Sequence, residues 1–220
     1  MNFNEYAKNR YKEFQVSNLS SVRNISKKYK DGERTGNDIK EFIFKVSNFC
    51  DSWGFDFDDA VDEIISSDIT AAKFSKDPKK QNLGEICQKD FLGIRGVVVE
   101  KLSAGGKNNL RLMDGEVIKG MKANQISDDR NATKSLDFIR GNDFIYAKWT
   151  EGDCGGAQDN QYNDVVHFLK EANRYIKKYD DGKRFIALLD GAIYKLENRR
   201  EQILPLTNDR VIITDSDTYE

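Results

Sequence analysis

Residues 135–162 read SLDFIRGNDFIYAKWTEGDCGGAQDNQY and carry the strongest structural signal in the chain. Two short runs, 135–139 and 144–150, are rich in β-branched and aromatic residues and flank a four-residue turn at 140–143, which predicts a β-hairpin. A glycine-rich turn and the polar segment GGAQDNQY at 155–162 follow the hairpin. They open a helix that we expect to run from about Gln158 to Tyr179.

The hairpin fixes which side chains face each other. A turn at 140–143 places Ile139 opposite Phe144, so Asp137 faces Tyr146. Because side chains alternate along a strand, Tyr146 and Lys148 share a face. Asp137 then lies diagonally from Lys148, within roughly 7 to 8 Å at the backbone. The opposite face is expected to be apolar and to consist of Leu136, Phe138, Ile145, Ala147 and Trp149.

Downstream of the hairpin, the pattern predicts more of the same sheet. The run RFIALLD at 184–190 has the apolar continuity of a buried central strand, and RVIIT at 210–214 predicts a last strand. Upstream, apolar residues recur at helical spacing from residue 83, and 97–99 either continues that helix or opens a strand. The helical stripe there is Leu83, Ile86, Cys87, Phe91 and Ile94. Residues 103–134 are expected to be irregular or short-stranded.

The first third of the chain differs in character. Residues 1–75 show helical periodicity, and the charged break KDPKKQN at 76–82 separates them from the rest. We therefore expect an N-terminal helical region at 1–80 and an α/β (mixed α+β) core at 81–220, packed as one compact domain. The aspartates between 56 and 62 lack the spacing of a calcium loop and predict a solvated helix start. The neighbouring aromatic residues, expected to be core, are Trp53, Phe55 and Phe57.

Composition excludes several classes of protein. The chain has 220 residues, 35 basic and 37 acidic, for a net charge of −2, so any nucleic-acid contact needs a local basic patch. The single histidine excludes metal sites built from several histidines and argues against an HNH-type nuclease. Three cysteines without CxxC spacing predict neither disulfides nor zinc. No apolar run is long enough to cross a bilayer, and we expect a cytoplasmic protein without membrane association.

An acid and a lysine on one strand face suit phosphodiester hydrolysis. That reaction uses a divalent ion that activates water and stabilises charge on the phosphate oxygens. An aspartate on a rigid strand holds such an ion, because magnesium prefers oxygen ligands. A nearby lysine orients or deprotonates the water, or neutralises the developing anion.

This constellation resembles the PD-(D/E)xK nucleases, and type II restriction endonucleases in particular. Asp137, within SLDF, matches the metal-binding acid, and Lys148 matches the catalytic lysine. GGAQDNQY and RFIALLDGAIY are also similar to segments of these enzymes, so the resemblance covers roughly 83–215. It implies a central mixed sheet flanked by helices, Mg²⁺ (with Mn²⁺ as a substitute), double-stranded DNA as substrate, a homodimer and a cognate DNA methyltransferase. It also implies DNA contacts by Gln158, Asn160, Gln161 and Lys134, because Gln and Asn read adenine through two hydrogen bonds.

The departure from the family is at Tyr146, where Glu or Asp is expected. Glu100, at the end of the preceding helical segment, is the first candidate for a displaced catalytic and metal-binding carboxylate. The alternatives just past the lysine strand are Glu151 and Asp153. A weaker ion site would use Asp137, the backbone carbonyl near Ala147 and water. The remaining alternative is a protein that binds DNA without cutting it.

Two other functions remain open from the sequence. The same core serves repair or recombination nucleases that act on ends or flaps, although no GxxxxGK[ST] motif for ATP is present. A non-enzymatic interaction protein would use the N-terminal helical region and its aromatic residues as an interface. Nucleophilic hydrolases are disfavoured, because no GxSxG motif occurs.

Overall fold

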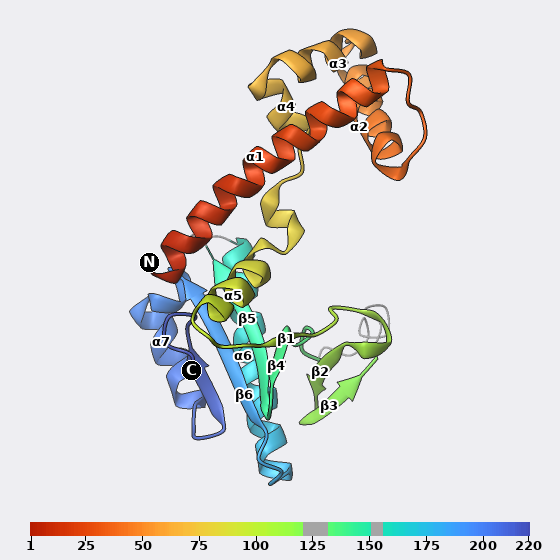
Figure 1. Cartoon of the computed structure of the whole chain (residues 1–220). Coiled ribbons are helices and arrows are strands. Elements are labelled where there is room, and N and C mark those ends of the chain that lie inside the picture. The colour runs from red at the N-terminus through yellow and green to blue at the C-terminus, as the bar shows by residue number, and fades with distance from the viewer. Residues whose placement is uncertain (121–131, 151–155) are drawn as a thin grey trace. The chain divides into compact units, whose positions relative to one another are not determined.

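The computed structural model describes residues 1–120, 132–150 and 156–220. The chain forms two compact units: a helical unit of residues 8–83, and a sheet unit that combines residues 1–7 with 84–220 (Figure 1). A boundary near residue 80 was expected, but it was expected within one compact domain, and the chain instead divides into two units. No helix in the described part of the chain is both long and apolar enough to span a membrane.

The helical unit contains the helices expected from the periodicity of residues 1–75. They are α1 (Phe3–Lys30), α2 (Asn37–Trp53), α3 (Phe57–Ser66) and α4 (Asp68–Phe74), followed by the short 3-10 helix η1 (Pro78–Gln81). Phe42, Val46 and Ile64 are buried in one apolar cluster. The side chain of Asp56 accepts hydrogen bonds from the backbone N–H groups of Asp58 and Asp59, which confirms the predicted helix start.

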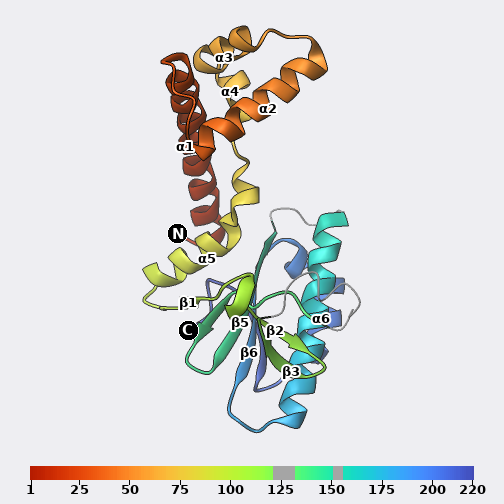
Figure 2. The ribbon, with the colours of Figure 1, turned by 90° about the vertical axis from the view of Figure 1, so that its right-hand side faces the viewer.

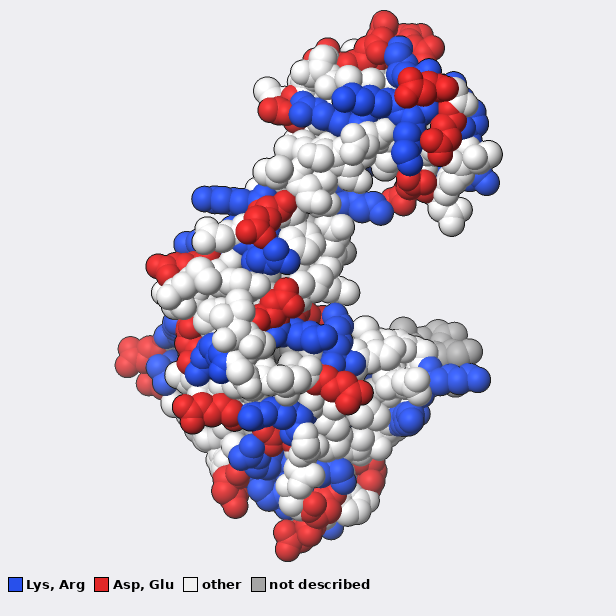
Figure 3. Space-filling model, viewed as in Figure 1, with Lys and Arg blue, Asp and Glu red and all other residues white. Residues whose placement is uncertain are grey.

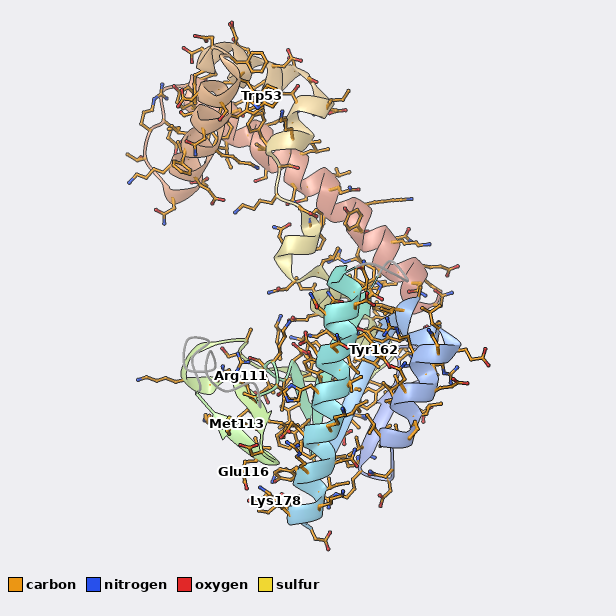
Figure 4. The ribbon with its side chains drawn as sticks, turned by 180° about the vertical axis from the view of Figure 1, so that it is seen from behind. Trp53, Arg111, Met113, Glu116, Tyr162 and Lys178 are labelled. Atoms are coloured by element: carbon orange, nitrogen blue, oxygen red, sulfur yellow. The ribbon has the colours of Figure 1, made fainter. Side chains whose placement is uncertain are left out.

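The aromatic residues that follow α2 are not core. Trp53 is 69% exposed and Phe55 is 58% exposed, so their predicted burial is wrong. The reason is the end of α2: Gly54 adopts a left-handed conformation, with φ of 70°, and turns the chain away from the apolar stripe. Phe57, on the next helix, packs against the cluster as expected. Figure 4 labels Trp53 in this unit.

The sheet unit is built on a five-stranded mixed sheet in the order β1-β4-β5-β6-β7. β4 is antiparallel to both β1 and β5, whereas β5, β6 and β7 are parallel. The strands are β1 (Glu100–Lys101), β4 (Phe138–Arg140), β5 (Asp143–Thr150), β6 (Arg184–Gly191) and β7 (Val211–Thr214). A separate hairpin pairs β2 (Leu110–Met113) with β3 (Glu116–Lys119). The helices are α5 (Leu83–Ile94), α6 (Gly156–Lys178) and α7 (Glu197–Ile203), with the 3-10 helices η2 (Gly106–Asn108), η4 (Ile193–Lys195) and η5 (Leu204–Leu206).

Each face of the sheet has its own apolar layer. One layer joins Phe144, Tyr146 and Phe185 to α6, which runs along that face in Figure 2. The other joins Ile145 and Ile186 to Leu92 of α5. β6 is buried along nearly its whole length between two parallel neighbours, as its continuous apolar run predicted. The mixed sheet flanked by helices therefore agrees with the expected fold class.

The hairpin register is the predicted one. Ile139 pairs with Phe144, and Phe138 pairs with Ile145. Leu136 is the exception: it packs in the α6 layer and not with Phe138. The reason is that β4 begins only at Phe138, and the backbone N–H of Leu136 donates to Leu110 of β2 instead. Trp149 does point to the α5 side, where it contacts Gly84.

Two local predictions around α5 need correction. Ile94 is 66% exposed because α5 ends there and Gly96, with φ of 81°, reverses the chain. Residues 97–99 neither extend the helix nor form a strand, and β1 begins at Glu100. Val97 and Val99 are nevertheless buried in the α5 layer.

The first residues of the chain belong to the sheet unit, although residues 1–80 were expected to form one region. Phe3 is almost fully buried, and its ring packs edge-on against Phe91 and Trp149 at centroid distances of 5.6 and 6.2 Å. Its backbone N–H donates to Asp217 at 2.8 Å. The aromatic side chain at position 3 supplies the missing cover for the end of α5 and β5.

Candidate active site

Asp137 stands where β4 separates from β5. Its backbone N–H still donates to the Ile145 carbonyl at 2.9 Å, but the preceding residue already pairs with β2. The next backbone donor on β5, the N–H of Ala147, is satisfied by Asp137 Oδ2 at 2.8 Å. The carboxylate therefore replaces a backbone carbonyl in the ladder. This position fixes it at the sheet and leaves it 7% exposed.

Lys148 follows on β5 and meets the same carboxylate. Its Nζ lies 3.6 Å from Asp137 Oδ2, and its side chain is 18% exposed. The ammonium also lies 4.2 Å from the centroid of the Tyr146 ring, an arrangement that holds a cation by attraction to the aromatic face. The predicted acid–lysine pair therefore forms, and it is largely withdrawn from water.

A second carboxylate approaches Asp137 from α5. Glu85 lies in the first turn of this helix and forms an ion pair with Lys101 of β1 at 2.9 Å. Its negative charge acts on Asp137 and raises the pKa of that carboxyl. Three residues later, the amide of Gln88 donates to the Lys148 carbonyl at 3.2 Å and to Asp190 at 2.7 Å. One face of α5 thus carries an acid and an amide toward the site.

The charge on Asp137 is only partly compensated. Burial raises its pKa to about 6, the charge of Lys148 opposes that rise, and the charge of Glu85 adds to it. Lys148 lies beside Asp137 and Lys101 pairs with Glu85, so the two carboxylates have two ammonium groups near them. A divalent cation beside Asp137 would further favour the ionised form of this carboxyl.

The donor set fits magnesium. Magnesium is held in proteins by one or two carboxylates and keeps several waters, so Asp137 and Glu85 are the carboxylates that could hold it here. No cluster of three or more His, Cys, Asp or Glu side chains suited to a metal occurs among residues 1–120, 132–150 and 156–220. The alternative acids Glu151 and Asp153 lie outside these described residues. The backbone of Ala147, another expected ligand, contributes its N–H to Asp137.

Glu100 is not brought to the lysine. It lies exposed in β1, opposite Ile139, which in turn pairs with Phe144. Lys148 is four residues further along β5, so two strand spacings and four residue rises separate the two backbones by on the order of 15 Å. The expectation that the helix preceding the sheet supplies an acid agrees better with Glu85, which sequence reasoning missed.

Tyr146, where the resemblance predicted an acid, is fully buried. Its ring stacks on Phe168 of α6 at 5.0 Å, and its hydroxyl has no hydrogen-bond partner among the described residues. Burial raises the pKa of this phenol strongly, and the charges of Asp164 and Asp137 add to the effect. The hydroxyl therefore stays protonated and does not replace a carboxylate as an anionic ligand.

The residues expected to contact DNA lie near the start of α6, apart from Lys134. Gln158 and Gln161 are half-buried and Asn160 is exposed. The side-chain amide oxygen of Gln161 is buried and has no hydrogen-bond partner among the described residues. Lys134 pairs with Asp164 at 2.6 Å, so its charge is already engaged.

The start of α6 is anchored to α7. Tyr162, labelled in Figure 4, donates its hydroxyl to the Arg199 carbonyl at 2.8 Å. Arg199 in turn pairs with Asp159 at 2.5 Å. At the opposite end of α6, Lys178 meets Glu116 of β3 at 3.2 Å, also visible in Figure 4. The first turns of α6 are therefore held in place beside the carboxyl ends of the parallel strands.

The signal for Glu85 was present but weak. Glu85 and Gln88 are spaced i, i+3 on a helix whose other inward residues are apolar, and such spacing places them on one face. Apolar periodicity alone does not separate a polar pair that serves a site from one that faces solvent.

No family model, no curated protein and no solved structure matches this chain.

Proposed function

We propose that the protein is a magnesium-dependent nuclease that cuts double-stranded DNA at specific sequences, as type II restriction endonucleases do. The observation that carries the proposal is the Asp137–Lys148 pair, 3.6 Å apart at the divergence of two strands, with Glu85 acting on the same carboxyl. An ordinary surface ion pair would not be withdrawn from water in this way. A hydrolytic site for an anionic substrate requires both a cation and a proton-handling group.

Each residue has a defined task in this proposal. Asp137 and Glu85 would hold the magnesium ion, and the ion would supply an activated water and positive charge for the phosphate oxygens. Lys148 Nζ lies beside Asp137 and donates a hydrogen bond toward the attacking water or a phosphate oxygen. Tyr146 supports the lysine through its ring and excludes water from beneath it.

Binding of DNA must depend on local groups. In Figure 3, Lys and Arg are interleaved with Asp and Glu over the visible face of the sheet unit, without a broad basic surface. Gln158, Asn160 and Gln161, at the start of α6, are the proposed base-reading side chains. A homodimer would present two such sites to a two-fold symmetric sequence, and a cytoplasmic methyltransferase would protect the host DNA.

The first experiment is digestion of a long unmethylated DNA with magnesium or manganese, followed by electrophoresis. We expect discrete fragments with the wild type. Trimming from ends would instead indicate a repair or recombination nuclease, and tight binding without any cut would indicate a non-cleaving DNA-binding protein. Absence of both cleavage and binding across several DNA sources would overturn the proposal.

A matched pair of variants separates the two candidate acids. Glu85→Gln should lower the cleavage rate by about 100-fold or more, because the second carboxylate for magnesium is removed. Glu100→Gln makes the same chemical change at an exposed position and should cleave at the wild-type rate. The reverse result would return the metal site to Glu100.

A further inference from the structure

A cavity of about 330 Å³ opens at the carboxyl ends of two parallel strands, outside the site described above. The strands are β6 and β7, and the carboxyl ends of parallel strands are a common place for ligands. Its lining combines apolar residues from the α6 layer with cationic and hydroxyl side chains. The lining residues are Leu189, Tyr194, Lys195, Arg200, Ile213, Thr214, Asp215 and Thr218.

The two cationic side chains that line the cavity have no described partner. Lys195 on η4 and Arg200 on α7 are exposed, and neither side chain has an ion pair or hydrogen bond among the described residues. Asp215, the acid of the lining, is engaged: one of its oxygens accepts from the hydroxyl of Thr218 at 2.6 Å and from its backbone N–H at 2.9 Å. With two cations and one carboxylate, the lining carries a net charge of +1.

Tyr194 also lines the cavity. It is 6% exposed, and its buried hydroxyl has no hydrogen-bond partner among the described residues. Tyr194 also acts electrostatically on Tyr146, the residue that supports Lys148. The cavity is thus a neighbour of the candidate active site.

We propose that this cavity binds a phosphate group. A guanidinium and an ammonium that line one small space match the charge and acceptor oxygens of phosphate. The source favoured here is a backbone phosphate of the nucleic acid, and this assignment rests on the proposed function. Free phosphate is the other source of the same chemistry.

The spacing agrees with a backbone phosphate. Lys148 pairs with Leu189, and the preceding residue of β6 pairs with Thr214 of β7. Two strand spacings therefore separate Lys148 from Thr214, roughly 10 Å at the backbone. One DNA strand rises about 3.4 Å per nucleotide along the duplex axis, and successive phosphates lie further apart than this rise, so a phosphate in the cavity would lie within about one to three nucleotides of the one being cut.

The test measures binding without cleavage, in EDTA. A labelled DNA duplex is titrated at several salt concentrations with wild type, with Lys195→Ala/Arg200→Ala, and with Lys170→Ala/Lys177→Ala, which removes the same charge from exposed positions of α6. We expect the cavity variant to bind about tenfold more weakly and to lose about two phosphate contacts from the salt dependence. The control should change little.

A second experiment measures the binding of inorganic phosphate alone, with the broadening of its phosphorus NMR line as the readout. Tyr194→Phe is the conservative variant. Phosphate binding that is lost in Lys195→Ala/Arg200→Ala, without any DNA binding by wild type, would assign the cavity to free phosphate. Equal DNA affinity in the cavity variant and the control, with no phosphate binding, would overturn the cavity as a phosphate site. If DNA bound through the cavity but was not cleaved in magnesium, the nuclease proposal would be wrong and the proposal of a phosphate site would still hold.

Discussion

Asp137 completes the hydrogen-bond ladder of β5 with its side chain: Oδ2 accepts the backbone N–H of Ala147 at 2.8 Å. A structural bond of this kind holds the carboxylate at a fixed place while its other oxygen stays free of that bond. The same residue that closes the sheet is thereby presented to Lys148. If the proposed nuclease activity is correct, stability and activity depend on the same carboxylate, and substitutions can separate the two.

Replacement of Asp137 should have two distinguishable results. Asp137→Ala leaves the buried Ala147 N–H without an acceptor and should lower the free energy of unfolding by about 1–3 kcal/mol. Asp137→Asn retains an acceptor oxygen and should fold nearly as well, yet lose cleavage by about 100-fold or more, because the anionic ligand is gone. Urea denaturation and a DNA cleavage assay measure the two effects. Full activity in Asp137→Asn would exclude a metal-binding role.

The free energy of unfolding should fall as the pH rises through the titration of two buried aspartates. An acid whose pKa is lowered by an ion pair would give the opposite slope. Burial raises the pKa of both Asp137 and Asp190 to about 6, above the ~3.9 of an unfolded aspartate. Between pH 4 and 6 the folded state therefore binds more protons than the unfolded state. The free energy of unfolding should fall as pH rises through this window and level off above it.

Thermal unfolding across pH, without metal, checks this slope. Asp137→Asn and Asp190→Asn should each flatten it, whereas Asp209→Asn, at an exposed position, should not. Magnesium should raise the melting temperature above pH 6 and have little effect below pH 5, because it competes with the proton on Asp137. A magnesium effect independent of pH would argue against Asp137 as its ligand.

Tyr146 offers a test of an unpaired buried hydroxyl. Tyr146→Phe removes a group without a described partner and should leave stability unchanged or raise it by about 1 kcal/mol. Tyr162→Phe is the matched comparison: its hydroxyl bonds to Arg199, so the same change should cost about 1 kcal/mol. If urea denaturation gave equal losses for both, an unseen partner of Tyr146 would be indicated.

A carboxylate at position 146, where PD-(D/E)xK nucleases carry Glu or Asp, should destabilise this protein. Tyr146→Glu places a carboxylate in a fully buried site that already feels the charges of Asp137 and Asp164. We expect a destabilisation of several kcal/mol at neutral pH that lessens in acid, where the new carboxyl is protonated. A stable and more active Tyr146→Glu variant would show that the site accepts the family's usual ligand.

Gly191 is the last residue of β6 and pairs with Thr150 of β5. Its φ is +114°, and a Cβ atom would lie 1.9 Å from the Thr150 carbonyl oxygen. Gly191→Ala should therefore lower the free energy of unfolding by about 3 kcal/mol or more. Gly93→Ala, in α5 with open space around it, should be neutral or stabilising by up to ~1 kcal/mol. Chemical denaturation of the two variants compares them directly.

The parts of the fold that follow from short-range patterning were predictable. Alternation and a four-residue turn were enough to pair Ile139 with Phe144, and continuous apolar character identified β6. The structure differs from the predictions where contacts between residues far apart in the sequence determine the position of a side chain. Leu136 left the hairpin because β2 offered another acceptor, and Glu85 reached Asp137 only through the packing of α5 on the sheet. Neither event has a local pattern in the sequence.

The burial of Phe3 against Phe91 and Trp149 gives the chain an interleaved order. The helical unit interrupts the sheet unit in sequence, so no single cut separates two complete pieces. A chain shortened to begin at residue 84 would bare the ring of Trp149, next to Lys148, even though every strand of the sheet remained. Limited proteolysis between residues 30 and 37 should accordingly leave an N-terminal fragment that co-purifies with the remainder.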